Sequence, residues 1–412
     1  MPSPILVIGA FDTKGDEYGF LIDEIRARGF DVFTVNTGVL GTTSRFQVDI
    51  EAEEVASAAR SKLQALRDAD DRGNAMKVMG QGAAEISRRL YAEGRVSGII
   101  GMGGSGGSSV VTAGMRALPV GVPKICVSTV ASGNTSAYVG TSDVTLIPSI
   151  ADVAGINRIS RIIFSRAAGA ICGMVDRSPP ESDDDRPIIV ASMFGNTTTC
   201  VDACASALND VGYEVLIFHA TGAGGRTMES LIDEGFAEGV LDITTTEWAD
   251  TVCGGAFDAG PDRLSAPGRV SVPHLIVPGC VDMANFGGPE TVPQKYRDAG
   301  RLLYEWNPSV TLMRTNVDEN RRMGEAFAEK ANAANGPVAF LFPLKGVSIL
   351  DGDGERFCDR EADQAIFNAI RKNLKPGIPI YEVDCNINDP EFSARAVELM
   401  LELIQSKGNH GP

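Results

Sequence analysis

The stretch Val96-Ser-Gly-Ile-Ile-Gly-Met-Gly-Gly-Ser-Gly-Gly-Ser-Ser-Val110 decides the fold of this chain. An apolar run is followed by a loop composed mainly of glycine and serine, and then by a segment that can form a helix. The apolar run predicts a buried parallel strand, and the glycines predict a tight turn out of it. A strand, a tight loop and a helix in this order indicate one βαβ unit of an α/β protein.

The same alternation continues through the first half of the chain. Buried strands are predicted at 5–8, 31–35, 98–101 and 124–128, with helices at 17–28, 50–66, 76–93 and 108–118. This repetition predicts a doubly wound, mostly parallel sheet.

A polar segment with three consecutive aspartates and several prolines, residues 176–187, then interrupts the pattern. Its composition is typical of a linker, and a long surface loop within one domain is the alternative. Beyond it, strands are predicted at 188–192, 214–218, 274–277, 310–313, 338–342 and 380–383, with helices at 200–211, 227–234 and 389–405. We therefore predict two Rossmann-like domains, 1–178 and 187–408, joined by the linker 179–186, with a ligand cleft between them.

Charge and composition limit the classes of partner. The 412 residues carry a formal net charge of -17, which opposes binding to nucleic acid. The chain lacks the pattern of a signal peptide and the long apolar run of a membrane span, so we expect a cytoplasmic protein. Eight cysteines without a Cys-x-x-Cys pair are typical of reduced core thiols.

The glycine loop formally matches the dinucleotide fingerprint as Gly101-x-Gly103-x-x-Gly106. A dinucleotide site also needs an acidic residue about 20 residues later, and 121–128 contains none. A Walker A loop needs Gly-Lys-Ser/Thr, whereas this loop ends Gly106-Gly-Ser-Ser109. We predict a different phosphate cradle, built from peptide N–H groups at a helix N-terminus, with a tight structural turn as the alternative. Its predicted members are Gly103, Gly104, Ser105, Gly106, Gly107 and Ser108.

Other polar loops follow predicted strands of the first domain, where ligands of doubly wound sheets collect. Asp12, Thr13 and Lys14 follow the first strand, and a surface ion pair is the alternative for Asp12 and Lys14. The hydroxyl-rich loop after the fourth strand contributes Thr129, Ser132, Gly133 and Asn134, and Asp143 beyond it could hold Mg²⁺ through water. Capping and turn formation are the alternatives for these residues.

The second domain has candidate anion sites of its own. A second anionic group is predicted to contact Asn196, Thr197, Thr198, Gly224, Gly225, Lys345 and Ser348. The threonines could instead be a simple N-cap run, and the loop after 338–342 a tight polar turn. His219 is the one attractive acid-base candidate, with Lys14 as the other weak catalytic candidate, although a lone imidazole more often has a structural role.

Several of these motifs resemble the Tm-one-like ATP-binding domain family. They are Gly9-Ala-Phe-Asp-Thr-Lys14, Gly101-Met-Gly-Gly-Ser-Gly-Gly107, residues 115–134, residues 150–157 and Lys345-Gly-Val-Ser348. These are bacterial and fungal two-domain proteins related to the ATP-binding N-terminal region of a plant tobamovirus-resistance protein. The resemblance extends from about residue 3 to residue 405. It implies two Rossmann-like subdomains, dimerisation and ATP binding by the first subdomain, with contacts at Asp12, Thr13, Lys14, the 103–107 loop, Thr129, Ser132 and Gly133.

Three functional hypotheses follow. The first is a homodimeric ATP-binding protein, in which the helix predicted at 153–175 could pack between domains or protomers. The second is a Mg²⁺-dependent phosphoryl-transfer or ligase-like enzyme that acts on a small anionic metabolite in the interdomain cleft. The third, a nicotinamide dehydrogenase, is disfavoured by the missing ribose-binding acid.

Overall fold

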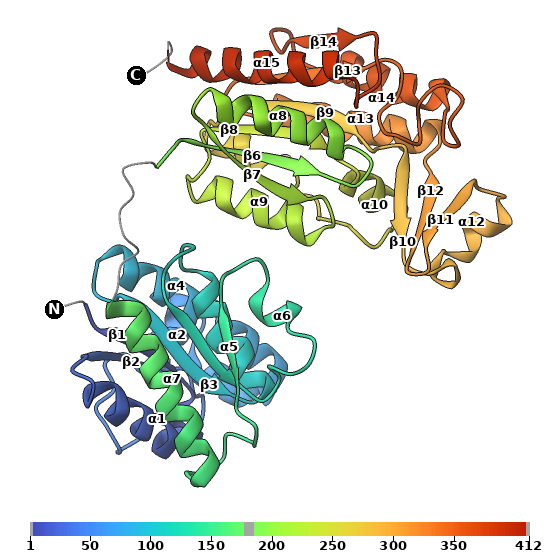
Figure 1. Ribbon diagram of the computed structural model, residues 1–412. Coiled ribbons are helices and arrows are strands. Elements are labelled where there is room, and N and C mark those ends of the chain that lie inside the picture. The colour runs from blue at the N-terminus through green and yellow to red at the C-terminus, as the bar shows by residue number, and fades with distance from the viewer. Residues whose placement is uncertain (1–2, 177–184, 409–412) are drawn as a thin grey trace. The chain divides into compact units, whose positions relative to one another are not determined.

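The computed structural model describes residues 3–176 and 185–408, and the chain divides into two compact units, Met1–Ser182 and Asp183–Pro412 (Figure 1). Each unit is a doubly wound α/β domain built on a mostly parallel sheet, as predicted. The predicted linker 179–186 falls almost entirely outside the described residues.

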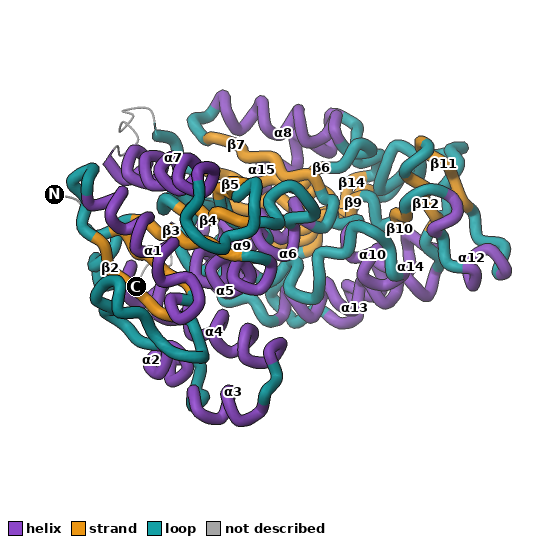
Figure 2. The backbone as a smooth tube through the Cα atoms, turned by 90° about the horizontal axis from the view of Figure 1, so that it is seen from below, coloured by secondary structure: helices purple, strands orange, loops and turns teal. Residues whose placement is uncertain are grey.

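The N-terminal unit contains five parallel strands in the order β2-β1-β3-β4-β5. Its elements are β1 (Ile5–Gly9), α1 (Phe11–Arg26), β2 (Val32–Asn36), α2 (Ala52–Ala58), α3 (Leu63–Ala69), α4 (Arg72–Ala92), β3 (Gly98–Gly103), α5 (Ser105–Arg116), β4 (Lys124–Ser128), α6 (Ser136–Val139), β5 (Thr145–Pro148) and α7 (Arg158–Asp176). Side chains of α2, α4 and α5 form one apolar core, and those of α1 and α7 form the other. Figure 2 shows these two groups of helices on opposite faces of the sheet.

Tyr18 of α1 lies where β1 and β3 stop pairing. The ladder between the two strands ends at Val7 and Ile100. Just beyond it, the buried Tyr18 hydroxyl accepts a hydrogen bond from the Met102 N–H at 2.8 Å and lies 3.0 Å from the Ile8 carbonyl and 2.7 Å from the Met102 carbonyl. Burial raises the pKa of this phenol, so it stays protonated and can donate. A side chain thus replaces the missing backbone hydrogen bonds between the strands.

The C-terminal unit repeats this strand order on a larger scale. Its main sheet has the order β14-β13-β9-β8-β6-β7, which begins at β7 with the same pattern as the first unit. Its main elements are β6 (Ile188–Met193), α8 (Thr198–Asp210), β7 (Glu214–His219), α9 (Ala223–Asp233), β8 (Gly239–Thr244), α10 (Glu247–Cys253), α11 (Ala266–Arg269), β9 (His274–Gly279), α13 (Val317–Asn332), β13 (Val338–Pro343), α14 (Arg360–Asn373), β14 (Ile380–Val383) and α15 (Pro390–Gly408).

A small antiparallel sheet is inserted between β9 and β13 and corrects one prediction. It consists of β10 (Met283–Phe286), β11 (Leu303–Asn307) and β12 (Val310–Arg314), with α12 (Gln294–Asp298) beside it (Figure 1). The strand predicted at 310–313 therefore does not extend the parallel sheet. Periodicity identifies a strand but not its partner, so the sequence pattern could not separate the two sheets.

Several helix boundaries also differ from prediction. The helix predicted at 50–66 is two helices, α2 and α3, separated at Arg60, whose φ of 57° is left-handed. The helices α1, α5 and α9 begin inside their glycine-containing loops rather than after them. The helix α7 begins at Arg158 instead of 153, after Gly155 with a φ of 79°.

All eight cysteines are free thiols, and all but Cys358 are buried. Within the described residues, no helix is both long and apolar enough to cross a membrane.

Candidate functional site

A cavity of about 630 Å³ lies at the carboxyl edge of the N-terminal sheet. Its walls come from the loops after β1, β2 and β3 and from α3 and α4. The strand order reverses between β1 and β3, and ligands of doubly wound sheets bind at such a switch point. The volume lies within the usual range for small-molecule sites.

The glycine loop forms one wall of this cavity as the N-terminus of α5. Gly104 is the N-cap residue in an extended conformation, and the first helical hydrogen bond runs from the Ser108 N–H to the Gly104 carbonyl at 2.8 Å. The N–H groups of Ser105, Gly106 and Gly107 precede this bond and have no acceptor within the described chain. Free N–H groups together with the positive end of the helix dipole favour an anion at this place.

Ser108 does not face the cavity, although it was predicted to contact phosphate. Its side chain is fully buried, and its Oγ lies 2.6 Å from Ser128 Oγ and 3.2 Å from the Gly103 carbonyl. The reason is that α5 begins at Ser105, which turns Ser108 toward the sheet.

Gly103 and Gly104 have different spatial requirements. A methyl group on Gly103 would lie 2.8 Å from Gly107 Cα, whereas the nearest atom to one on Gly104 would be 3.8 Å away. We expect Gly103→Ala to lower the free energy of unfolding of this unit by about 1–3 kcal/mol, because the α5 backbone must shift. Differential scanning calorimetry measures this change. Gly104→Ala is the matched control, and an equal loss of stability in both variants would contradict the explanation.

The start of α1, directly after β1, brings Asp12, Thr13 and Lys14 to the same cavity. Lys14 interrupts the first turn of α1 with a φ of -133°, and its Nζ donates to the Val153 carbonyl. Asp12 Oδ2 accepts from the Leu40 N–H at 2.9 Å, while its buried Oδ1 has no partner among the described residues. The cavity thus contains a lysine and a carboxylate oxygen that is free to accept a hydrogen bond or to bind a cation.

The structure adds cavity residues that the sequence analysis did not identify. Arg72 at the start of α4 lines the cavity, and its Nη2 would lie 3.7 Å from a methyl group on Gly106. A basic residue in a first helical turn opposes the helix dipole, which is a sequence signal that could have drawn attention to it. Apolar side chains of Leu66, Met76 and Val110 line another part of the cavity.

The hydroxyl-rich loop after β4 divides between two roles. Thr129 and Ser132, which the resemblance assigns to ATP, do not line the 630 Å³ cavity but a second cavity of about 460 Å³. Asn134 Oδ1 instead accepts from the Ser136 N–H at 3.1 Å, so it forms a turn, and Gly133 closes the preceding turn onto the Val130 carbonyl at 3.0 Å.

Asp143, which was predicted to hold Mg²⁺ through water, contacts a buried lysine. Its Oδ1 lies 2.6 Å from Nζ of Lys124, which is fully buried, and its Oδ2 accepts from the Gly121 N–H at 2.8 Å. A buried lysine needs a counter-ion, and the Asp143 carboxylate serves as that counter-ion. Among the described residues there is no group of three or more His, Cys, Asp or Glu side chains arranged to hold a metal ion.

The glycine loop of the C-terminal unit is already filled by the chain itself. Glu247 Oε1 accepts from the Gly222 N–H at 2.7 Å and from the Gly225 N–H at 3.1 Å. A methyl group on Gly225 would collide with this carboxylate, and one on Gly224 with the His219 backbone. The predicted external anion is therefore replaced by an internal carboxylate, so Gly224 and Gly225 are not a free ligand site. His219 itself is exposed at the end of β7.

The predicted ligands after β6 are largely closed off as well. Asn196 and Thr197 are buried, and Thr197 Oγ1 lies 2.7 Å from Thr244 Oγ1. Thr198 Oγ1 reaches back to the Gly195 carbonyl at 3.3 Å. Thr197 is the N-cap residue of α8, but neither threonine side chain accepts from an N–H of the first helical turn, so the capping alternative does not describe their side-chain contacts either.

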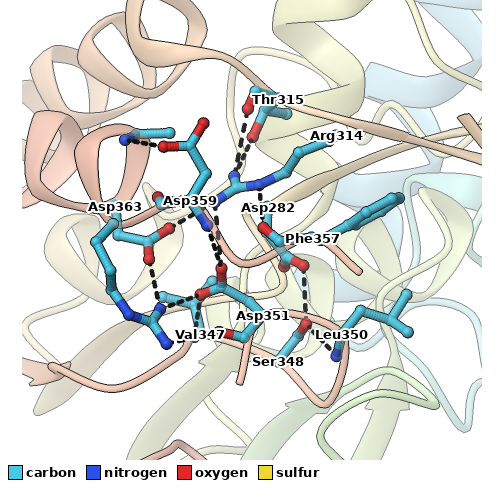
Figure 3. A network of polar contacts seen from close by, with 12 residues as sticks. Asp282, Arg314, Thr315, Val347, Ser348, Leu350, Asp351, Phe357, Asp359 and Asp363 are labelled. Atoms are coloured by element: carbon cyan, nitrogen blue, oxygen red, sulfur yellow. Dashed lines mark hydrogen bonds and ion pairs between the residues drawn. The ribbon is translucent and has the colours of Figure 1, made fainter. Parts of the chain in front are cut away.

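Ser348 belongs to a buried network of polar contacts in the C-terminal unit (Figure 3). Its Oγ donates to Asp282 Oδ2 at 2.8 Å, while Arg314 contacts Asp351 at 3.2 Å and Asp363 at 2.7 Å. Burial raises the pKa of Asp282 to about 6, and burial with the neighbouring carboxylates raises that of Asp351 to about 8. Lys345 lies outside this network, in an exposed ion pair with Asp384 at 2.9 Å.

Comparison with known proteins matches the two halves of the chain to two family models. Residues 3–180 match the N-terminal domain, and residues 186–404 the C-terminal domain, of an uncharacterised protein family, UPF0261. A UPF0261 protein of Clostridium tetani is 45% identical, with 98% of this chain and 100% of that protein aligned. A UPF0261 protein of Mesorhizobium japonicum is 46% identical over 97% of this chain and 99% of its own length.

The comparison also finds plant relatives. The ToMV susceptible protein tm-1(GCR26) of Solanum lycopersicum is 38% identical over 98% of this chain, which corresponds to 56% of the tomato protein. The ToMV resistance protein Tm-1(GCR237) of the same plant is 38% identical and is covered to the same extent.

Proposed function

The chain belongs to the uncharacterised protein family UPF0261, and from this premise we propose that its N-terminal unit binds a nucleoside triphosphate, ATP, in the 630 Å³ cavity. The observation that carries the proposal is the N-terminus of α5. Three consecutive residues with free N–H groups line a cavity at the switch point of the sheet, and the family resemblance in the glycine loop agrees with a phosphate there.

The charged side chains around the cavity are of both signs. Lys14, Arg67 and Arg72 line it together with Asp12, Asp70, Asp71 and Asp152, so we expect a polyphosphate to bind as its Mg²⁺ complex. The unpartnered Oδ1 of Asp12 can accept from a ribose hydroxyl or contact a Mg²⁺ ion that accompanies the phosphates. The apolar side chains of Leu66, Met76 and Val110 suit the face of a base.

A thermal-shift panel of ATP, ADP, AMP, NAD and NADP, each with and without Mg²⁺, tests the proposal on the full chain. We expect ATP to stabilise the wild type most, by about 2.7 kcal/mol at a ligand concentration near 100 times Kd. Gly104→Val should abolish this stabilisation, because the valine side chain would stand beside the free N–H groups and block a phosphate there. The fold itself can accommodate the substitution, since the nearest atom to a methyl group on Gly104 is 3.8 Å away. Lys14→Ala should weaken ATP binding more than AMP binding.

Gly173→Val is the matched control for the glycine substitution. Gly173 lies on the exposed face of α7, and a methyl group there meets no described atom within 4 Å. This variant should bind ATP as the wild type does. If no nucleotide stabilises the wild type, or if Gly104→Val binds ATP normally, the proposal is wrong.

A further inference from the structure

The second cavity of the N-terminal unit, about 460 Å³ in volume, lies at the carboxyl ends of β4 and β5. Its polar walls include Thr129, Ser132, Ser149 and Asp152. Asp152 also lines the first cavity, so the two cavities adjoin.

Three polar side chains in this cavity are free to bind a ligand. Thr129, Ser132 and Asp152 are exposed, and their side chains make no hydrogen bond within the described chain. The other two hydroxyls are committed internally. Ser128 Oγ lies 2.6 Å from Ser108 Oγ, and Ser149 Oγ donates to the Ala151 carbonyl at 2.6 Å.

These groups select a particular ligand chemistry. Two free hydroxyls can donate or accept, and the Asp152 carboxylate only accepts. The described residues that line this cavity include no lysine or arginine, so an anionic ligand would meet an unopposed carboxylate. A neutral molecule with several hydroxyl groups can donate to Asp152 and exchange hydrogen bonds with Thr129 and Ser132.

The backbone at the rim of the cavity is strained. Ile150 has a φ of 66°, and its side chain is 76% exposed. A β-branched residue in the left-handed region is a conformational outlier, and such strain concentrates at ligand sites.

The order of the strands sets the two cavities on either side of the glycine loop. Along the carboxyl edge the sequence is β2, β1, β3, β4, β5. The first cavity is bounded mainly by the loops after β2, β1 and β3, with Asp152 from the loop after β5, and the second by the loops after β4 and β5. The glycine loop follows β3, and a methyl group on Gly104 would lie 3.8 Å from Thr129 Oγ1. A phosphate on this loop is therefore next to the second cavity.

We propose that the second cavity binds a neutral polyhydroxylated acceptor, a sugar or polyol, with one hydroxyl facing the terminal phosphate of ATP. This inference rests on the proposed function. The acceptor oxygen bonds to the γ-phosphorus while the bond from that phosphorus to the β,γ-bridging oxygen breaks. ADP leaves with the electron pair, and the hydroxyl proton passes to Asp152, the carboxylate common to both cavities.

The test uses the full chain loaded with a non-hydrolysable ATP analogue and Mg²⁺. Thermal shift is measured on adding D-ribose, D-xylose, ribitol or erythritol, with citrate and 3-phosphoglycerate as anionic counterparts. We expect at least one neutral compound, and neither anion, to add stability. Ser132→Phe should weaken that binding at least about tenfold by filling the cavity, and Asp152→Asn by a similar factor through loss of the charged acceptor.

Ser57→Phe is the matched control, because Ser57 is exposed on α2 and lies outside both cavities. With ATP and the stabilising polyol, ³¹P NMR should show a phosphate ester that Asp152→Asn does not form. If the analogue stabilises the wild type and Ser132→Phe but no neutral polyol adds to it, this inference fails and the proposed function stands. Polyol binding without any ester overturns the transfer step, and failure of the analogue to bind overturns the proposed function itself.

Discussion

Replacing Arg263 by methionine is expected to lower the free energy of unfolding of the C-terminal unit by about 3–5 kcal/mol. Arg263 is only 1% exposed and is surrounded by three buried carboxylates. Its Nε lies 2.7 Å from Glu247, and Nη1 lies 3.2 Å from Glu229 and 3.0 Å from Asp242. Methionine fills similar space without charge, so the carboxylates remain buried with no counter-ion.

The same network predicts how pH modifies this loss. The arginine and His274 hold the pKa of Asp242 well below its ordinary value against the effect of burial. Without the arginine, mild acid should recover part of the stability, because a protonated carboxyl group needs no counter-ion. Urea unfolding followed by tryptophan fluorescence measures this unit alone, since both tryptophans, Trp248 and Trp306, lie in it.

Arg269→Met is the matched control. Arg269 pairs with Asp233 on the surface, where the two side chains are 47% and 40% exposed. A surface pair of this kind contributes about 0–1 kcal/mol, so the control should stay close to the wild type. Comparable losses in the two variants would show that burial of the Arg263 network is not what stabilises the unit.

The second large effect concerns pH and Asp250. This fully buried carboxyl accepts from the Asn285 N–H and from Asn285 Nδ2, each at 2.7 Å, and burial raises its pKa to about 8. In the unfolded chain an aspartate ionises near pH 4. Between pH 4 and pH 8 the unfolded state therefore loses this proton and the folded state keeps it. The contribution of Asp250 to the free energy of unfolding should fall over this range by on the order of 5 kcal/mol and then level off.

Asp250→Asn isolates this contribution, because asparagine does not titrate and still offers an oxygen to the Asn285 N–H. Urea midpoints of wild type and variant, measured by tryptophan fluorescence from pH 5 to pH 8, give the difference in stability at each pH. The stability of the wild type relative to that of Asp250→Asn should therefore decrease steadily as pH rises. Asp202→Asn, exposed on α8, is the control, and parallel pH curves for the wild type and Asp250→Asn would contradict the prediction.

The strand pattern predicted both doubly wound units, because most buried parallel strands are continuous apolar runs, but it missed β5 and also β8, whose run is interrupted by Asp242. The loop from Gly101 to Ser109 could also be placed at a carboxyl edge, since its strand and helix are adjacent in sequence. What could not be predicted is pairing over distance. β12 pairs with the adjacent β11, but its other partner, β10, lies about 25 residues earlier, and no local signal identifies it.

The same limit explains the uneven outcome for candidate site residues. Gly104 and Gly225 both stand at a helix N-terminus after a strand, yet the Glu247 carboxylate fills one of these positions and only a tertiary contact reveals this. In the sequence Asp143 has no neighbouring counter-ion, and only the fold places the buried Lys124 beside it. Arg72 lies on a helix far along the chain from the glycine loop, so spacing alone could not associate them.

Tyr18 has a consequence for ligand affinity. Its hydroxyl occupies the gap between Ile8 and Met102, where β1 and β3 diverge at the edge of the candidate site. The strands are thus held apart by the folded protein itself, before any ligand arrives. The free-energy cost of separating the strands is therefore met during folding and not during binding. The site is preorganised, and a ligand does not have to separate the strands in order to enter.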